Sequence, residues 1–342
     1  MKLIASILAG TTAAFIVCAQ DASPNGIRVR IAAAEIVVAE AAKAADREFD
    51  AWADKLPEGP HELRPDGATD VFDFESVEKN VTINGVGGGK GAVLRGNPAM
   101  VPGRVGNGLR LKGSARAVFP EIGRFTRSDT FSMSLWVRLS AVSERVVMIH
   151  RTSITPNGGN QGYEVSLENG RVAFGLFHDP AGSAAKVVTR KAPMFGQWLH
   201  LAVTYDGSSR AAGMKVFLNG EPSDTEVAAD SLRRDIVPED GSAELTIGFH
   251  TGKSGFEGGT VDEFRVFART LVPIEIASLA GRDDFTVALQ AIPQLSPAQR
   301  TALLEYYIGT THQASIDARA ALSALRDEER RNANASQRTK GR

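Results

Sequence analysis

Residues 196–209 read GQWLHLAVTYDGSS, and a second apolar run, MKVFLNGEP, follows at residues 214–222. Side chains alternate along the first run, so that two sets face opposite sides of an extended strand: Leu199, Leu201, Val203 and Tyr205 on one side, and Trp198, His200, Ala202 and Thr204 on the other. Asp206-Gly207 and Asn219-Gly220 end the two runs with residues that favour the positive φ angles of hairpin turns. This stretch therefore predicts two neighbouring strands of a β-sheet.

The same alternation extends over residues 68–282, in short runs bounded by Gly, Asn and Asp. The predicted strands span residues 71–76, 108–113, 114–120, 130–140, 146–151, 162–168, 171–177, 197–205, 214–219, 243–249 and 259–269. Many short strands with frequent turn signals and few helices favour a β-sandwich or a barrel. The Gly-rich stretches 85–91 and 155–161 are predicted loops, and the first, GVGGGKG, lacks the spacing of a phosphate-binding loop.

Helices are predicted at both ends of this region. Residues 27–56 are Ala-rich, and Ala45, Phe49, Trp52 and Leu56 form one apolar stripe that requires a packing partner. Ser296-Pro297-Ala298-Gln299 fits a capping box, which opens one C-terminal helix, and a second helix is predicted over residues 314–330. The apolar stripes of these helices could pack together as a small bundle. The polar residues 331–342 show no periodicity and are predicted to be a disordered tail.

Composition limits the classes of function. A net charge of −1 leaves no basic surplus for nucleic acid, and Cys18, the only cysteine, excludes an intramolecular disulfide. Residues 1–20, MKLIASILAGTTAAFIVCAQ, are predicted to be a signal peptide, which indicates a secreted, periplasmic or cell-surface protein. A membrane anchor and a misassigned gene start are the alternatives. No other stretch approaches the ~20 apolar residues of a membrane span.

The order of motifs resembles that of a known family. VGNGLRLKG, FSMSLWVRL, GQWLHLAVTYDGSS, MKVFLNGEP, LTIGF and VDEFRVFARTLVPIEIASLAG together resemble the laminin-G-like domain of the concanavalin A-like superfamily, over residues 70–282. The resemblance implies an all-β jelly-roll β-sandwich of two antiparallel sheets. The predicted organisation is a signal peptide (1–20), an N-terminal helical linker (21–62), the jelly-roll domain (63–282), a C-terminal helical segment (283–330) and the tail (331–342).

The helical flanks are similar to the linkers around this module in planctomycete-type cytochrome-linked surface proteins. Those proteins carry cytochrome-c-like modules, whereas this sequence has no CxxCH haem-attachment motif. A role that depends on haem is therefore not expected here.

A structural metal is one expectation. On the run VDEFRVFA, alternation places Asp262 on the face of Phe264, Val266 and Ala268, so its carboxylate is expected to point toward the core and to need a partner. The resemblance implies a structural Ca²⁺ in many relatives, with oxygens from the first strand and a nearby loop, here Asp73 and Asn107. The alternative is a carboxylate that accepts hydrogen bonds from backbone N–H groups.

A ligand-binding face is a second expectation. Trp198 and His200 are expected on the face of their strand that points away from the core, and so is Trp136, whose neighbours Leu135 and Val137 point inward. Glu263 and Arg265 are expected on the face of their strand that Asp262 does not share. If these strands share a sheet, its second face carries aromatic and hydrogen-bonding groups that suit sugar rings or peptides. The alternative is that both tryptophans are packing residues, covered by loops or by the flanking helices.

No catalytic constellation is evident. Glycoside hydrolases of this superfamily use carboxylates spaced Glu-x-Asp-x-x-Glu, which does not occur here, and neither GxSxG nor HExxH is present. The sequence favours a non-catalytic, exported binding or assembly module that recognises a glycan or protein at the cell surface. The alternatives are a structural spacer without a ligand and a divergent glycoside hydrolase or lyase.

Overall fold

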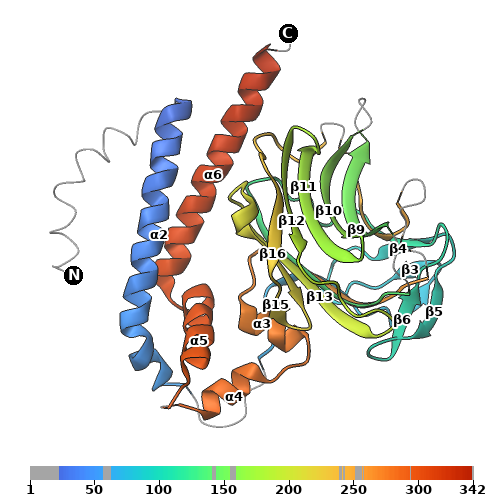
Figure 1. Ribbon diagram of the computed structural model, residues 1–342, viewed down its shortest axis with the longest axis horizontal. Helices are drawn as coiled ribbons and strands as arrows, with labels where there is room; N and C mark the ends of the chain where they lie inside the picture. Colours follow the sequence, from blue (N-terminus) through green and yellow to red (C-terminus); the bar gives the residue numbers. More distant parts are fainter. Residues whose placement is uncertain are drawn as a thin grey trace. The chain divides into compact units, whose positions relative to one another are not determined.

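The computed structural model describes residues 23–56, 63–140, 144–154, 159–238, 241, 243–250, 256, 258–292 and 294–340 (Figure 1). The predicted signal peptide, residues 1–20, lies outside this range. The chain forms two compact units: residues Leu56–Tyr306, and a helical unit made of the described residues up to Lys55 and from Tyr307 onward.

Residues Leu56–Tyr306 form a sandwich of two antiparallel sheets, which confirms the predicted all-β jelly-roll fold (Figure 1). The eight-stranded sheet has the order β15-β14-β13-β8-β18-β6-β5, with β1 also paired to β18, and the ten-stranded sheet has the order β16-β12-β11-β10-β9-β17-β7-β4-β3-β2. The strands of the first sheet are β1 (Ala68–Phe72), β5 (Ala99–Pro102), β6 (Asn107–Arg110), β8 (Thr130–Arg138), β13 (Trp198–Asp206), β14 (Met214–Leu218), β15 (Glu221–Pro222) and β18 (Thr260–Phe267). Those of the second are β2 (Val77–Glu78), β3 (Val81–Thr82), β4 (Ala92–Arg95), β7 (Arg116–Phe119), β9 (Arg145–Ile154), β10 (Asn160–Glu168), β11 (Arg171–Asp179), β12 (Ser183–Thr189), β16 (Thr225–Asp230) and β17 (Leu245–Gly248).

Every predicted strand overlaps an observed one. The structure adds strands that the sequence does not predict, namely β2, β3, β4, β5, β12, β15 and β16. Most of these strands have only two to four residues, too few to show a clear alternation of apolar and polar side chains. Residues 85–91 form no strand or helix, as expected of a loop, whereas the second predicted loop, 155–161, lies partly outside the described residues, and its last part, from Asn160, belongs to β10.

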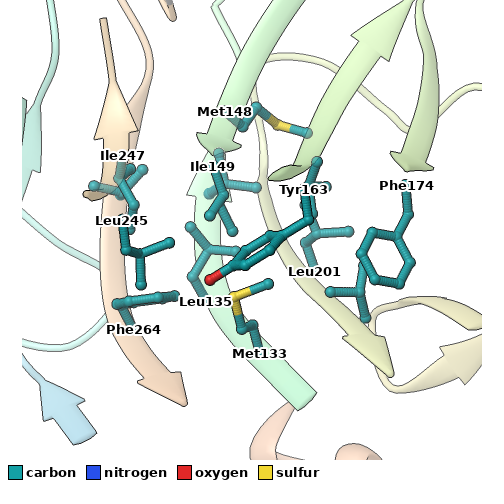
Figure 2. Close-up of a cluster of buried hydrophobic side chains, with 14 of the residues drawn as sticks. Met133, Leu135, Met148, Ile149, Tyr163, Phe174, Leu201, Leu245, Ile247 and Phe264 are labelled. Carbon is teal, nitrogen blue, oxygen red and sulfur yellow. The ribbon is translucent and has the colours of Figure 1, made fainter. Parts of the chain in front are cut away.

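The core lies between the inner faces of the two sheets. Figure 2 shows side chains of the eight-stranded sheet, among them Met133, Leu135, Leu201 and Phe264, facing Ile149, Tyr163, Phe174, Leu245 and Ile247 of the ten-stranded sheet. Each of these side chains is at most about 1% exposed, and burial of one such side chain stabilises the fold by roughly 1.5–3 kcal/mol. The one buried polar tip among them, the Tyr163 hydroxyl, donates a hydrogen bond to the Gly123 carbonyl at 2.8 Å. The alternating residues therefore specify this core.

A second, smaller cluster covers one end of the outer face of the eight-stranded sheet. Ala202 and Phe217 of that sheet pack with Phe267, Leu271 and Ile276. Ile276 belongs to α3 (Pro273–Leu279), which follows β18. Part of the outer face is thus packed rather than free.

The helical unit pairs α2 (Pro24–Ala53) with α6 (Gln313–Lys340). Arg30 and Glu328 form an ion pair at 2.9 Å between the two helices. The predicted apolar stripe is buried at Phe49, and the Trp52 ring stacks on Tyr307 with 4.6 Å between centroids. The prediction that the terminal helices pack together is therefore confirmed for α2 and α6.

The disordered tail predicted over residues 331–342 is wrong for residues 331–340, which continue α6. Residues 341 and 342 lie outside the described range. No Gly or Pro interrupts the helix there, and Arg331 pairs with Asp327 one turn earlier at 2.7 Å. Helical propensity and local ion pairs thus extend a helix that has little apolar periodicity at this end.

The remaining helical elements are α4 (Asp284–Gln290), α5 (Pro297–Thr310) and a short 3₁₀ turn, Ala211–Gly213. The predicted capping box of α5 is confirmed, since Gln299 N donates to Ser296 Oγ at 3.3 Å and Ser296 N donates to Gln299 Oε1 at 2.9 Å. Within the described residues, none of the helices is both long enough and apolar enough to cross a membrane.

Candidate ligand-binding site

The strands that carry the predicted ligand-binding residues are neighbours. β8 lies between β13 and β18 in the eight-stranded sheet, with His200 opposite Trp136, and Trp136 opposite Asp262. The next rows pair Trp198 with Arg138 and place Arg265 opposite Ser134. Trp136, Trp198, His200 and Arg265 therefore lie on one face, the outer face of this sheet, as the alternation predicts.

Asp262 lies on the opposite face of β18 from the one predicted, because the strand contains a β-bulge. Glu263 adopts a φ of 51°, and the register shifts between Asp262 and Arg265, so that two residues of β18 oppose one residue of β8. Asp262 consequently shares the outer face with Trp136, whereas Phe264 points into the core. The prediction that Asp262 and Phe264 lie on the same face of β18 is therefore wrong, because the extra residue shifts the alternation by one position.

Three arginines and two tryptophans form the surface of this region, which we call the Arg–Trp face (Arg104, Arg110, Trp136, Arg138 and Trp198). The Arg104 guanidinium lies over the Trp136 ring, 4.5 Å from its centroid, and that of Arg138 lies 5.4 Å from the centroid of Trp198. Both indoles are partly exposed. Arg110 and Arg138 flank Thr260 in one row of the sheet, two strand spacings or roughly 10 Å apart.

The charges of the Arg–Trp face are unbalanced. Among the described residues, Arg104, Arg110 and Arg138 have no carboxylate within ion-pair distance. The nearby Glu263 is paired with Arg265 at 2.5 Å, and Asp262 is fully buried. A guanidinium placed over an indole has N–H groups left to donate, and these can bind an oxyanion.

His200 lies beneath the surface of this face and packs against Trp136. It is buried, its ring meets Trp136 edge-on with 5.3 Å between centroids, and its Nδ1 has no hydrogen-bond partner in the described part of the chain. Burial, with a smaller effect from the charge of Arg265, lowers the pKa of His200 to about 3. The ring is therefore neutral at ordinary pH and supports Trp136 from the side.

The Asp262 carboxylate stabilises the turn that contains Arg104 by accepting hydrogen bonds from its backbone. Its Oδ2 accepts hydrogen bonds from the backbone N–H groups of Arg104 at 2.7 Å and Val105 at 3.0 Å, and its Oδ1 accepts one from Glu263 at 2.8 Å. Gly103 is required beside it, since a Cβ there would lie 2.6 Å from Oδ2. Burial raises the pKa of Asp262 to about 6, while these hydrogen bonds act in the opposite direction.

The three residues predicted to bind calcium are each hydrogen-bonded to other groups of the protein. Asp73 Oδ1 accepts from Glu75 N at 3.1 Å, and the Asn107 side chain donates to Glu75 at 3.2 Å. The oxygens of Asp262 face N–H donors, which compete with a cation. The described residues hold no group of three His, Cys, Asp or Glu side chains arranged for a metal. This arrangement does not fit the convergent set of 6–8 oxygens that Ca²⁺ prefers.

We therefore expect that adding millimolar Ca²⁺ to EDTA-treated protein leaves its melting temperature unchanged. Scanning calorimetry with and without the ion measures this, since a ligand that binds only the folded state raises the melting temperature. A rise that the Asp262→Ala variant abolishes would contradict this expectation and support the calcium site.

Comparison with known proteins identifies the sandwich. Residues 111–277 match the family model for the concanavalin A-like lectin/glucanases superfamily. The sandwich has the concanavalin A-like fold. The match supports the resemblance to laminin-G-like domains seen in the sequence. No curated protein sequence matches the chain significantly.

Solved structures that resemble this chain have low sequence identity to it. The binding domain of Paraclostridial Mosquitocidal Protein 1 has a TM-score of 0.49 and 16% identity, with 63% of this chain and 52% of that chain covered. Domain 4 of AbnA, a GH43 extracellular arabinanase from Geobacillus stearothermophilus in complex with arabinotriose, has a TM-score of 0.47 and 19% identity, with 63% and 98% covered. Trypanosoma rangeli sialidase in complex with sialic acid has a TM-score of 0.47 and 16% identity, with 71% and 37% covered. This chain therefore spans about half the length of the first of these structures.

Sequence reasoning missed two members of the Arg–Trp face. Arg104 lies in the turn between β5 and β6, where no alternation predicts its direction, and β5 was not predicted. Arg110 lies near the end of β6 and reaches this face only because β6 pairs with β18. Arg138, by contrast, follows directly from the alternation that places Trp136 on the outer face.

Proposed function

We propose that this protein is a non-catalytic binding module that recognises an acidic ligand, on a glycan or a protein, through the Arg–Trp face. One observation carries the proposal: two partly exposed indoles each lie under a guanidinium that has no carboxylate partner among the described residues. The whole chain has a net charge of −1, so these cations are a local feature and not a general basic excess.

The chemistry of the face favours anions carried on a partly apolar ligand. Stacking on Trp136 and Trp198 restricts Arg104 and Arg138, which reduces the conformational entropy lost when a carboxylate or sulfate binds. The exposed parts of the indoles can contact the C–H groups of a sugar ring or an apolar side chain. An exported location, at the cell surface or beyond it, is part of the proposal and rests on the predicted signal peptide.

A structural spacer is the second candidate. Phe217 and Phe267, on the outer face of the same sheet, are buried against Ile276 of α3, which favours a packing role for at least that part of the face. A hydrolase is less favoured, because the nearest carboxylates are already engaged: Glu75 with Asn107, and Glu263 with Arg265.

Binding to glycan and protein panels that include acidic polysaccharides tests the proposal. We expect the Arg104→Ala/Arg138→Ala double variant to weaken the best ligand about tenfold or more, because two charged hydrogen bonds are lost. Trp136→Ala should have a similar effect, and the affinity of the natural protein should fall as salt is added.

The matched control is Arg95→Ala, an exposed arginine on β4 of the other sheet, which should leave binding unchanged. Thermal unfolding confirms that each variant is folded. If neither panel gives a ligand, or if the double variant binds as well as the natural protein, the spacer becomes the better assignment.

A further inference from the structure

Two histidines that are far apart in the sequence meet on the outer face of the ten-stranded sheet. His150 lies on β9, opposite Thr246 of β17, and its neighbour Ile149 points into the core. His250 follows two residues after the end of β17. The two rings meet edge-on, with 4.6 Å between centroids and 88° between ring planes. This pair lies on the other sheet from the Arg–Trp face and is separate from it.

The hydroxyl group of Thr152 lies close to both rings. Its Oγ1 is 3.3 Å from His150 Nδ1 and 3.5 Å from His250 Nε2. Both separations are longer than the roughly 2.7–3.0 Å that is typical of hydrogen bonds to a hydroxyl. They match the spacing of ligands around one metal ion, because tetrahedral ligands at about 2.1 Å from a metal lie roughly 3.4 Å from one another. Two imidazoles on such a metal have centroids roughly 5 Å apart, which is close to the observed separation of the rings.

A backbone carbonyl determines which nitrogen of His150 can bind a metal. His150 Nε2 lies 3.2 Å from the Phe249 carbonyl oxygen. Because a carbonyl oxygen only accepts, we assign the proton to Nε2 and the lone pair to Nδ1. Metal-binding histidines usually donate their other ring N–H to a carbonyl or carboxylate in this way. Burial, with a smaller effect from the neighbouring His250, lowers the pKa of His150 to about 4, so this ring is neutral at neutral pH.

The pair of histidines can be reached from solvent. His150 and Thr152 are partly exposed, whereas His250 is 7% exposed. Gly162, the residue opposite Thr152 on β10, has no side chain to cover the hydroxyl. Two imidazoles and one hydroxyl fill three positions of a tetrahedral metal, so the fourth position stays open to water or to an external ligand.

The charged groups nearest the two histidines are bound to other partners. Arg116 of β7 lies over the Phe249 ring, 5.4 Å from its centroid, and donates to the Ser114 carbonyl at 3.0 Å. Glu164, opposite His150 on β10, is ion-paired with Arg145. Among the described residues, no carboxylate completes a group of three metal-binding side chains with the two histidines. A set of neutral nitrogen donors favours Zn²⁺ or Cu²⁺ over Ca²⁺ and Mg²⁺, which prefer oxygen ligands.

We propose that His150 Nδ1, His250 Nε2 and Thr152 Oγ1 bind one divalent transition-metal ion of the class that prefers imidazole, namely Zn²⁺ or Cu²⁺. His250 binds in the tautomer that carries its proton on Nδ1. The ion connects β9 to the segment that follows β17, and the ladder between these two strands has only two residue pairs. Metal binding therefore stabilises this part of the ten-stranded sheet. The site does not depend on the function proposed for the Arg–Trp face.

Isothermal titration calorimetry with chelator-treated protein that carries no histidine tag tests this site. We expect one Zn²⁺ per chain, tighter binding of Cu²⁺, and no competition from millimolar Mg²⁺ or Ca²⁺. His150→Gln and His250→Gln should each lower the affinity for Zn²⁺ about tenfold or more, because each variant removes one of the two nitrogen ligands. The electron paramagnetic resonance spectrum of bound Cu²⁺ should show coupling to two imidazole nitrogens. Saturating Zn²⁺ should raise the melting temperature of the natural protein but not that of the variant lacking both histidines.

Two further variants complete the test. His178→Gln changes a histidine of β11 in the same sheet, whose Nδ1 is hydrogen-bonded to the Asp235 carbonyl, and it should bind Zn²⁺ like the natural protein. Thr152→Val keeps the shape of the threonine without its hydroxyl and should weaken Zn²⁺ binding several-fold. It replaces the histidine variants if thermal unfolding shows that they do not fold, and an unchanged affinity then counts against the site. The proposal is overturned if neither ion binds, or if His150→Gln and His250→Gln bind Zn²⁺ as tightly as the natural protein.

Discussion

Replacing Gly162 by alanine should lower the free energy of unfolding by roughly 3–5 kcal/mol, the largest effect expected of a single methyl group in this sandwich. Gly162 lies in β10 with a φ of 138°, a conformation that residues with a Cβ rarely adopt. A Cβ built there would lie 1.8 Å from the carbonyl oxygen of Arg151 on β9. Because that oxygen belongs to the backbone, it can move only if the pairing of β9 and β10 opens.

Urea unfolding of Gly162→Ala and of two control variants measures this effect. Gly87→Ala adds a methyl group in a loop where no atom of the described residues lies within 4 Å of the new Cβ, and it should be nearly neutral. At Gly175 the nearest atom to a new Cβ is the end of the Phe177 ring, which can rotate away, so Gly175→Ala should have an intermediate effect. A midpoint for Gly162→Ala close to that of Gly87→Ala would contradict the strained geometry.

Local patterns predicted much of the sandwich. Alternation placed Trp136, Trp198 and His200 on one face of a sheet, and the pairing of β8 with β13 confirms it. The predicted Asn219-Gly220 turn is confirmed, since Asn219 has a φ of 52° and Gly220 a φ of 83°, and the Asn169-Gly170 turn has the same pattern. These features depend on neighbouring residues, so a single sequence is enough to predict them.

Features that depend on distant residues were not predictable. The β-bulge at Glu263 places Asp262 on the outer face of the sheet instead of the core face, and nothing in the sequence VDEFRVFA indicates where the extra residue falls. His150 and His250 are a hundred positions apart, yet their rings lie 4.6 Å from each other because β9 and β17 are paired. The ion pair of Arg145 with Glu164 likewise arises from the pairing of β9 with β10. Contacts of this kind, between residues far apart in the chain, therefore had to come from the structure.

Replacing Asp262 by alanine should cost roughly 2–4 kcal/mol at neutral pH, since the backbone N–H groups of Arg104, Val105 and Glu263 lose their acceptor. The same change should release the turn that holds Arg104 over Trp136 and weaken binding at the Arg–Trp face. Asp262→Asn is the matched control, because it keeps one acceptor oxygen and nearly the same shape. We expect it to cost less than the alanine variant and to retain more of the binding.

The difference in stability between the natural protein and Asp262→Asn, whose amide carries no charge, should also depend on pH. Burial raises the pKa of Asp262 in the folded protein from its usual 3.8 to about 6. Between these values the folded state holds a proton that the unfolded state does not, so the stability from this group is complete below about pH 4 and is lost as the pH rises through about 6. The unfolding free energy of the natural protein, minus that of Asp262→Asn, should therefore fall by up to about 3 kcal/mol from about pH 4 to about pH 7. Groups common to both proteins cancel in this difference. A difference that rises over the same range would show that the three N–H donors outweigh burial and hold the carboxylate ionised.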